Sequence, residues 1–103
     1  MDINTLAKQI TEKFKGFKDF KGLYFYGSRV KGGFKEDSDY DVIMLFLNSV
    51  NYKTNKEIAG HLGDIEYEND VFIDYHPMTR EELIENPIFY NEVMNKGLYF
   101  EGT

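Results

Sequence analysis

Apolar side chains recur along the first half of the chain at spacings that predict one helix and two strands. The first apolar positions follow a period of three to four residues: Ile3, Leu6, Ile10 and Phe14. This period predicts a helix from about Asp2 to Phe14. Leu23–Tyr26 predicts a short aromatic strand, and residues 29–31 are expected to begin a short helix that ends at Gly32–Gly33. Asp41–Leu47 is apolar on both faces, which predicts a central strand covered on both sides.

The next part of the chain carries one helical and one strand signal. Asn51 to about Leu62 is expected to be helical, and Gly60 and Gly63 leave the position of its end open. Val71–Met78 predicts the following strand, with Pro77 closing it.

Helix-end signals mark the remaining elements. Thr79 and Glu82 match a capping box. Asn86–Pro87 is typical of the N-cap and first position of a last helix, which is expected to stop at Gly97. Leu98–Phe100 could add a short edge strand. This order of elements predicts an α/β or α+β fold in which helices pack on a small sheet.

The composition narrows the classes of function. A chain of 103 residues is long enough for one core but not two, so residues 1–103 are expected to form a single domain. The absence of cysteine excludes a disulfide framework and a thiolate metal site. The charged, amphipathic N-terminus does not fit a signal peptide, and the longest apolar run is too short to cross a bilayer. We therefore expect a cytoplasmic protein without membrane contact. The net charge of −6 argues against broad binding to a nucleic-acid backbone.

Two kinds of candidate chemistry lie close together in the sequence. Gly27-Ser28 directly follows a predicted strand, where glycine lets the backbone approach a phosphate and the next N–H groups can bind the anion. Asp39 and Asp41 are two residues apart at the entrance of a strand, so both point to the same face. Carboxylate oxygens favour Mg²⁺ or Mn²⁺ over Zn²⁺, and the pair could share one ion or bridge two. An ordinary turn and an acidic loop remain open for each feature alone. Together they indicate an enzyme acting on a nucleoside triphosphate.

Asp74 is the expected third carboxylate. It sits mid-strand, where an unpaired carboxylate would be costly to bury, and it could face Asp39 and Asp41 if its strand runs alongside. It could also take the proton from an attacking hydroxyl. The alternative is an edge-strand aspartate that faces water. Arg29, beside Ser28, is the best-placed cation to neutralise triphosphate oxygens, although a solvated surface charge would also explain it.

The Gly-Ser and Asp-x-Asp segment resembles the signature of the nucleotidyltransferase fold shared by the DNA polymerase β superfamily. The signature is matched from Gly27 through Gly32 and Ser38 to Val42, and Asp74 stands where that family places its third carboxylate. At its length, the chain is similar to the minimal nucleotidyltransferases of bacteria and archaea. The resemblance implies a small mixed sheet flanked by helices.

The resemblance also implies a set of site residues. Three aspartates would be catalytic and would bind two Mg²⁺ ions, with Mn²⁺ as an alternative, and three turn residues would contact the nucleotide. These are Asp39, Asp41 and Asp74, and Gly27, Ser28 and Arg29, respectively.

The function implied by the resemblance is transfer of a nucleoside monophosphate, AMP from ATP, to a hydroxyl. Minimal members often act as the antitoxin of a small all-helical HEPN protein, and some attach AMP to a tyrosine of that toxin. The chain has no second domain to bind a small acceptor, so a HEPN-type protein partner is the expected acceptor. Two alternatives stay open: a catalytically idle antitoxin that neutralises its partner by contact, and a small-molecule nucleotidyltransferase.

Overall fold

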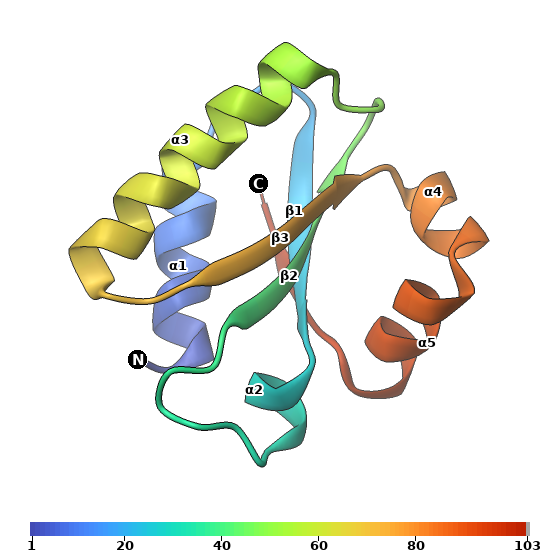
Figure 1. Cartoon of the computed structure of the whole chain (residues 1–103). Coiled ribbons are helices and arrows are strands. Elements are labelled where there is room, and N and C mark those ends of the chain that lie inside the picture. The colour runs from blue at the N-terminus through green and yellow to red at the C-terminus, as the bar shows by residue number, and fades with distance from the viewer. Residues whose placement is uncertain (103) are drawn as a thin grey trace.

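Helices cover both faces of a four-stranded sheet in the computed structural model, which describes residues 1–102 (Figure 1). The strands lie in the order β3-β2-β1-β4. Their bounds are β1 (Phe20–Tyr26), β2 (Tyr40–Phe46), β3 (Ile73–Met78) and β4 (Leu98–Glu101). β2 and β3 are parallel, whereas β1 is antiparallel to both β2 and β4. This mixed sheet confirms the expected α+β class and the internal position of β2.

The helices divide between the two faces of the sheet. Their bounds are α1 (Ile3–Lys13), α2 (Ser28–Lys31), α3 (Tyr52–Asn69), α4 (Arg80–Glu85) and α5 (Pro87–Lys96). α1 and α3 pack on one face, while α4 and α5 pack on the other (Figure 1). α2 follows β1 and precedes the loop that leads into β2. Within residues 1–102, no helix is long and apolar enough to span a membrane.

The caps predicted for α4 and α5 are present, and α1 has a further cap that was not predicted. Asp2 accepts a hydrogen bond from the Thr5 amide at the start of α1. Thr79 and Glu82 form the reciprocal bonds of a capping box at α4. Asn86 caps α5, which ends before Gly97 as expected. These side chains accept hydrogen bonds from amides that have no partner inside the helix, so they fix where each helix begins.

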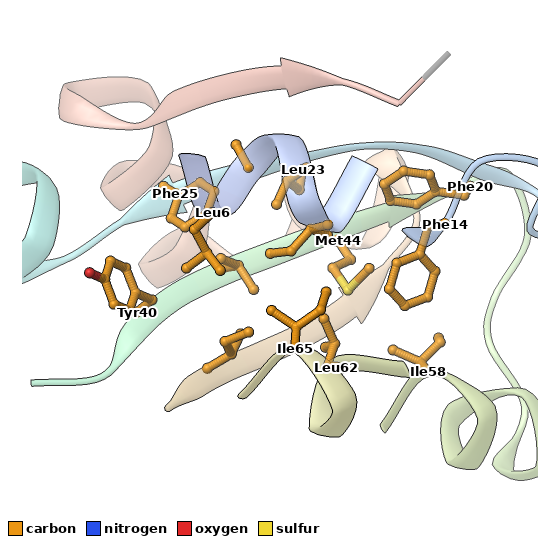
Figure 2. Packing of buried hydrophobic residues seen from close by; sticks show 14 of the residues in the cluster. Leu6, Phe14, Phe20, Leu23, Phe25, Tyr40, Met44, Ile58, Leu62 and Ile65 are labelled. Carbon is orange, nitrogen blue, oxygen red and sulfur yellow. The ribbon is translucent and has the colours of Figure 1, made fainter. Parts of the chain in front are cut away.

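The larger core cluster lies between β1, β2 and the α1–α3 face (Figure 2). Leu6 of α1 and Phe14, the residue that follows α1, meet Leu62 of α3 across Met44 of β2, and all four side chains are buried. Six of the seven residues of β2 are buried, and the exception is Asp41. The central strand is therefore apolar except at the position where a carboxylate was expected to act.

Three elements differ from the sequence predictions. α3 continues to Asn69, through Gly60 and Gly63, because burial of Ile58 and Ile65 outweighs the cost of about 1 kcal/mol for each helical glycine. No atoms lie within 4 Å of the position of a Cβ at either glycine, so these residues face open space.

Strand β3 also differs from the prediction, because it starts at Ile73 and contains Pro77 instead of ending there. A proline is tolerated at this position because β3 is an edge strand with one side free of ladder partners. Strand β1 begins at Phe20, three residues before the predicted start at Leu23. The additional residues of β1 pair with β2 through a register shift between Phe20 and Gly22, which the apolar pattern does not predict.

Candidate functional site

Two carboxylates from neighbouring strands meet near the beginnings of β2 and β3. Asp41 and Asp74 are direct partners in the parallel register of these strands. Asp41 is half-buried, while the side chain of Asp74 is 52% exposed. Adjacent strands lie about 4.7–4.9 Å apart, so two side chains on the same face at the same level are in reach of one another. The pairing therefore confirms that Asp74 faces Asp41.

The electrostatics of Asp41 show how close these groups are. Its pKa is raised above the ordinary value of 3.8, first by burial and then by the negative charges of Asp74 and Asp39. The charge of His76 opposes this shift. Like charges that face one another disfavour the ionised form of each. The protein thus holds carboxylates together in spite of their mutual repulsion.

Asp39 stands beside this pair without completing a cluster. It is exposed and lies one residue before β2, yet its charge is felt by Asp41. Among residues 1–102, no group of three or more His, Asp or Glu side chains is arranged to hold a metal ion. The structure therefore brings two of the three expected ligands together and leaves Asp39 next to them.

The available donors fit a hard divalent cation. All are carboxylate oxygens, which are the ligands that Mg²⁺ and Mn²⁺ prefer. The pKa of Asp41 is raised first by burial and then by the charges of Asp74 and Asp39, so these charges lie close to it. A cation between the carboxylates would offset their repulsion and would lower the pKa of Asp41. Mg²⁺ keeps several waters when it binds to proteins, so it does not require a full cage of side chains.

Gly27 brings the turn after β1 into contact with Asp41. Its φ is +80°, a conformation that side chains other than glycine rarely adopt. A Cβ at this position would lie 2.2 Å from Asp41 Oδ2. The two halves of the sequence motif therefore touch: the glycine turn leaves space that the Asp41 carboxylate occupies.

Ser28 and Arg29 form the first positions of α2 and are both half-buried. The first N–H groups of a helix have no intrahelical acceptor, so the turn can donate hydrogen bonds to an anion. Arg29 donates hydrogen bonds to the backbone of the loop between α2 and β2. Its assignment as a triphosphate contact stays a prediction.

Aromatic side chains lie beside the carboxylates. Tyr26 pairs with Asp41 across β1 and β2. Its pKa is raised, first by burial and then by the charges of Asp41, Asp74 and Glu92. His76 Nε2 lies 3.6 Å from Asp74 Oδ2, and its ring lies 4.7 Å from the ring of Phe89.

Glu92 and Phe89 could not be found from the motif, because both lie on α5 and reach the site only through folding. Glu92 Oε2 lies 2.6 Å from Lys31 Nζ, so the end of α2 is tied to α5. The signal for Tyr26 was available: it immediately precedes Gly27 on the strand whose register partner is Asp41.

Replacement of Asp41 by Asn should stabilise the protein when no divalent cation is present. The raised pKa means that the charged carboxylate destabilises the folded state, fully at pH values above the folded pKa and not at all well below 3.8. This gain should be present at neutral pH and should raise the melting temperature. It should shrink as the pH falls towards 3.8.

Thermal melts in a chelator at several pH values test this expectation. Asp37→Asn, in the exposed acidic loop, is the matched control and should change stability little. A gain that is the same at acidic and neutral pH would contradict the assignment of repulsion to Asp41. Addition of Mg²⁺ or Mn²⁺ should raise the melting temperature of the wild type more than that of Asp41→Asn, since a ligand stabilises the state that binds it.

Solved structures with the same fold are toxin–antitoxin complexes. A toxin–antitoxin with AMP-PNP matches with a TM-score of 0.67 and 17% identity, over 90% of this chain and 70% of that chain. The MntA–HepT toxin–antitoxin matches with a TM-score of 0.61 and 14% identity, over 93% and 69% of the two chains. A tri-AMPylated Shewanella oneidensis HEPN toxin in complex with MNT antitoxin matches with a TM-score of 0.61 and 13% identity, again over 93% and 69%. At these identities the likeness shows the fold alone.

Sequence comparison places the chain in a family. No curated protein sequence gives a significant match. A family model does match, over residues 8–95, and it describes the polymerase β nucleotidyltransferases. The matched range contains the glycine turn and all three aspartates. The chain therefore belongs to the polymerase β nucleotidyltransferase family, as its Gly-Ser and Asp-x-Asp signature predicts.

Proposed function

We propose that this protein is a Mg²⁺-dependent nucleotidyltransferase that transfers AMP from ATP to a hydroxyl of a HEPN-type toxin, and so acts as its antitoxin. The observation that supports this most directly is the Asp41–Asp74 pair lying against the Gly27 turn. Family membership supports the reaction class. The partner is suggested by solved structures of the same fold, which are toxin–antitoxin complexes, one of them with a tri-AMPylated HEPN toxin.

In this proposal the site residues divide into two groups. Asp39, Asp41 and Asp74 hold Mg²⁺, with Mn²⁺ as a substitute, and the turn that starts with Gly27 and Ser28 receives the triphosphate. The bound cation supplies neutralisation of phosphate charge. Asp41 is fixed by its position on the buried central strand. Asp39 is exposed and completes the ligand set from the end of the loop.

The transfer step forms one bond and breaks another. The acceptor oxygen bonds to the α-phosphorus of ATP, the bond from that phosphorus to the bridging oxygen breaks, and pyrophosphate leaves. The hydroxyl proton passes to the carboxylate of Asp74, which later releases it to water. Asp74 suits this task because its side chain is 52% exposed on an edge strand, where an acceptor from another molecule can reach it.

Intact-mass measurement of the partner provides the test. The protein is incubated with Mg²⁺, ATP labelled at the α-phosphate and a HEPN-type protein encoded beside it. The expected result is that the partner gains adenylate-sized mass increments together with the label, and that a chelator prevents both.

Each other outcome selects a different function. A partner that binds tightly but keeps its mass would overturn the proposed activity in favour of a contact-only antitoxin. The lack of a complete three-residue metal cluster among residues 1–102 is the observation that favours this alternative. Labelling of a small metabolite or antibiotic without any partner would instead identify a small-molecule nucleotidyltransferase.

A further inference from the structure

One side chain, that of Arg29, makes several hydrogen bonds to the loop between α2 and β2. Arg29 Nη2 donates hydrogen bonds to the carbonyl oxygens of Glu36 at 2.9 Å and Ser38 at 2.8 Å, and Arg29 Nε donates to Ser38 at 3.2 Å. An arginine has five N–H donors, so three of them are committed to loop backbone. Hydrogen bonds from a charged donor are about twice as strong as neutral ones.

The guanidinium also rests on aromatic rings. Its central carbon lies 4.2 Å from the ring centroid of Tyr40 and 4.6 Å from that of Phe34. Tyr40 is only 1% exposed, and its hydroxyl donates a hydrogen bond to the Met1 carbonyl oxygen. One of the two rings that contact Arg29 therefore belongs to the core, and the other belongs to the loop.

The residue that receives most of these bonds directly precedes Asp39. Ser38 accepts from Arg29 through its carbonyl oxygen, and its amide and hydroxyl bond to the backbone of Lys35 at 3.0 and 2.9 Å. The Ser38 carbonyl belongs to the peptide group whose nitrogen is that of Asp39. Arg29 thus fixes the peptide plane from which the Asp39 side chain departs.

We propose that Arg29 is a positioning residue that sets Asp39 relative to the Gly27-Ser28 turn. Arg29 follows Ser28 directly in α2, so one side chain links the turn to the aspartate at the far end of the loop. Asp39 has no strand pairing in β2 and is exposed. Its place therefore depends on the loop. The catalytic consequence rests on the proposed function, whereas the link itself does not.

A direct triphosphate contact is the competing role for this arginine. Two N–H groups on Nη1 make no hydrogen bond to the described residues, and Arg29 lines a cavity of about 570 Å³ together with Lys35 and Phe72. A contact would need the positive charge. Positioning needs the planar fork, which bonds to two carbonyls and stacks on rings, and lysine cannot reproduce it.

Arg29→Lys and Arg29→Ala separate these roles by kinetics. Positioning predicts that both variants lower kcat for AMP transfer by at least about 10-fold while KM for ATP changes less than about 3-fold. A direct charge contact predicts that Arg29→Lys keeps most of the activity and that the loss in Arg29→Ala falls mainly on KM. The second pattern would overturn the proposal.

Hydrogen–deuterium exchange gives a readout that requires no activity. In the free protein, the amides of Lys35 and Ser38, which donate hydrogen bonds within the loop, should exchange at least about 10-fold faster in both variants than in the wild type. Lys35→Met is the matched control, because it removes a cation from the same loop. The side chain of Lys35 makes no hydrogen bond or ion pair within residues 1–102. This control should leave the exchange unchanged.

Mn²⁺ titration followed by electron paramagnetic resonance completes the design. If the wild type transfers no AMP, the proposed function fails, but faster loop exchange together with weaker Mn²⁺ binding in Arg29→Lys still supports positioning of Asp39. Unchanged exchange and unchanged Mn²⁺ affinity in that variant overturn it. Arg29 lies outside both core clusters, so the variants should fold, and Arg29→Lys decides the question if Arg29→Ala does not.

Discussion

Asp41→Asn is expected to lower the rate of AMP transfer by roughly 10³-fold, because the loss of one charged ligand removes several kcal/mol of charge stabilisation in the transition state. The fold should survive, since Asp41 is the single position of β2 that is not buried. An amide of nearly the same shape leaves the contact with the Gly27 turn sterically unchanged. Asp39→Asn is expected to reduce transfer to a similar degree. Single-turnover transfer of labelled AMP, with circular dichroism to check the fold, measures both effects.

A nearby acid controls for loss of charge alone. Asp37 lies in the same exposed loop as Asp39, two residues before it. Asp37→Asn should therefore retain activity within about 3-fold, as surface changes usually do not affect the reaction. Transfer that persists in Asp41→Asn would remove Asp41 from the metal site. Equal loss in Asp37→Asn and Asp39→Asn would mean that the acidic loop acts through its total charge.

Asp41→Asn is expected to change stability and activity in opposite directions, which makes the two measurements a strict test together. This substitution should raise stability in the absence of metal and abolish transfer in its presence. A carboxylate that is kept charged against burial and against repulsion from Asp74 and Asp39 costs stability, and such groups are characteristic of functional sites. Substitution of a residue with a purely structural role would instead lower the stability of the protein.

The pairing of Asp41 with Asp74 shows how far sequence can lead. The two strands and the aspartate in each could be predicted from apolar runs and the family signature. Their register could not, because the chain leaves β2, passes through α3 and returns as a parallel neighbour. Such a crossover is compatible with several registers, and core packing of α3 selects one of them. The observed register places the aspartates level with one another.

The residues that sequence missed are those that long-range folding brings to the site. Phe89 and Glu92 lie on α5, far from the motif in sequence, and no local pattern distinguishes them from other surface residues of that helix. The hydrogen bonds of Arg29 are also invisible in sequence, which shows only a cation beside a serine. The charge of a side chain follows from the residue type alone, whereas the hydrogen-bond partners of Arg29 depend on how the loop between α2 and β2 folds.

Gly27→Ala is expected to disable the site and to weaken the fold. The backbone of Gly27, with φ +80° and ψ −158°, lies in a region that essentially only glycine adopts, and this strain alone would cost alanine about 1–3 kcal/mol. The new methyl group would also lie 2.2 Å from Asp41 Oδ2, so the carboxylate or the turn must move. We expect the free energy of unfolding to fall by about 1–3 kcal/mol and transfer to fall by at least about 10²-fold, since a displacement near 1 Å has that effect on positioned groups.

Gly16→Ala separates backbone strain from the contact with Asp41. Gly16 has the same φ of +80°, no atom lies within 4 Å of its Cβ position, and it lies in the turn between α1 and β1. The Gly16→Ala variant should lose some stability through its positive φ while its transfer rate stays normal. In a background that carries Asp41→Ala, the stability lost through Gly27→Ala should become smaller, because only the backbone strain remains. Denaturant unfolding and single-turnover assays on these variants decide the matter: normal transfer by Gly27→Ala would show that the turn and the aspartate work independently, in spite of their contact.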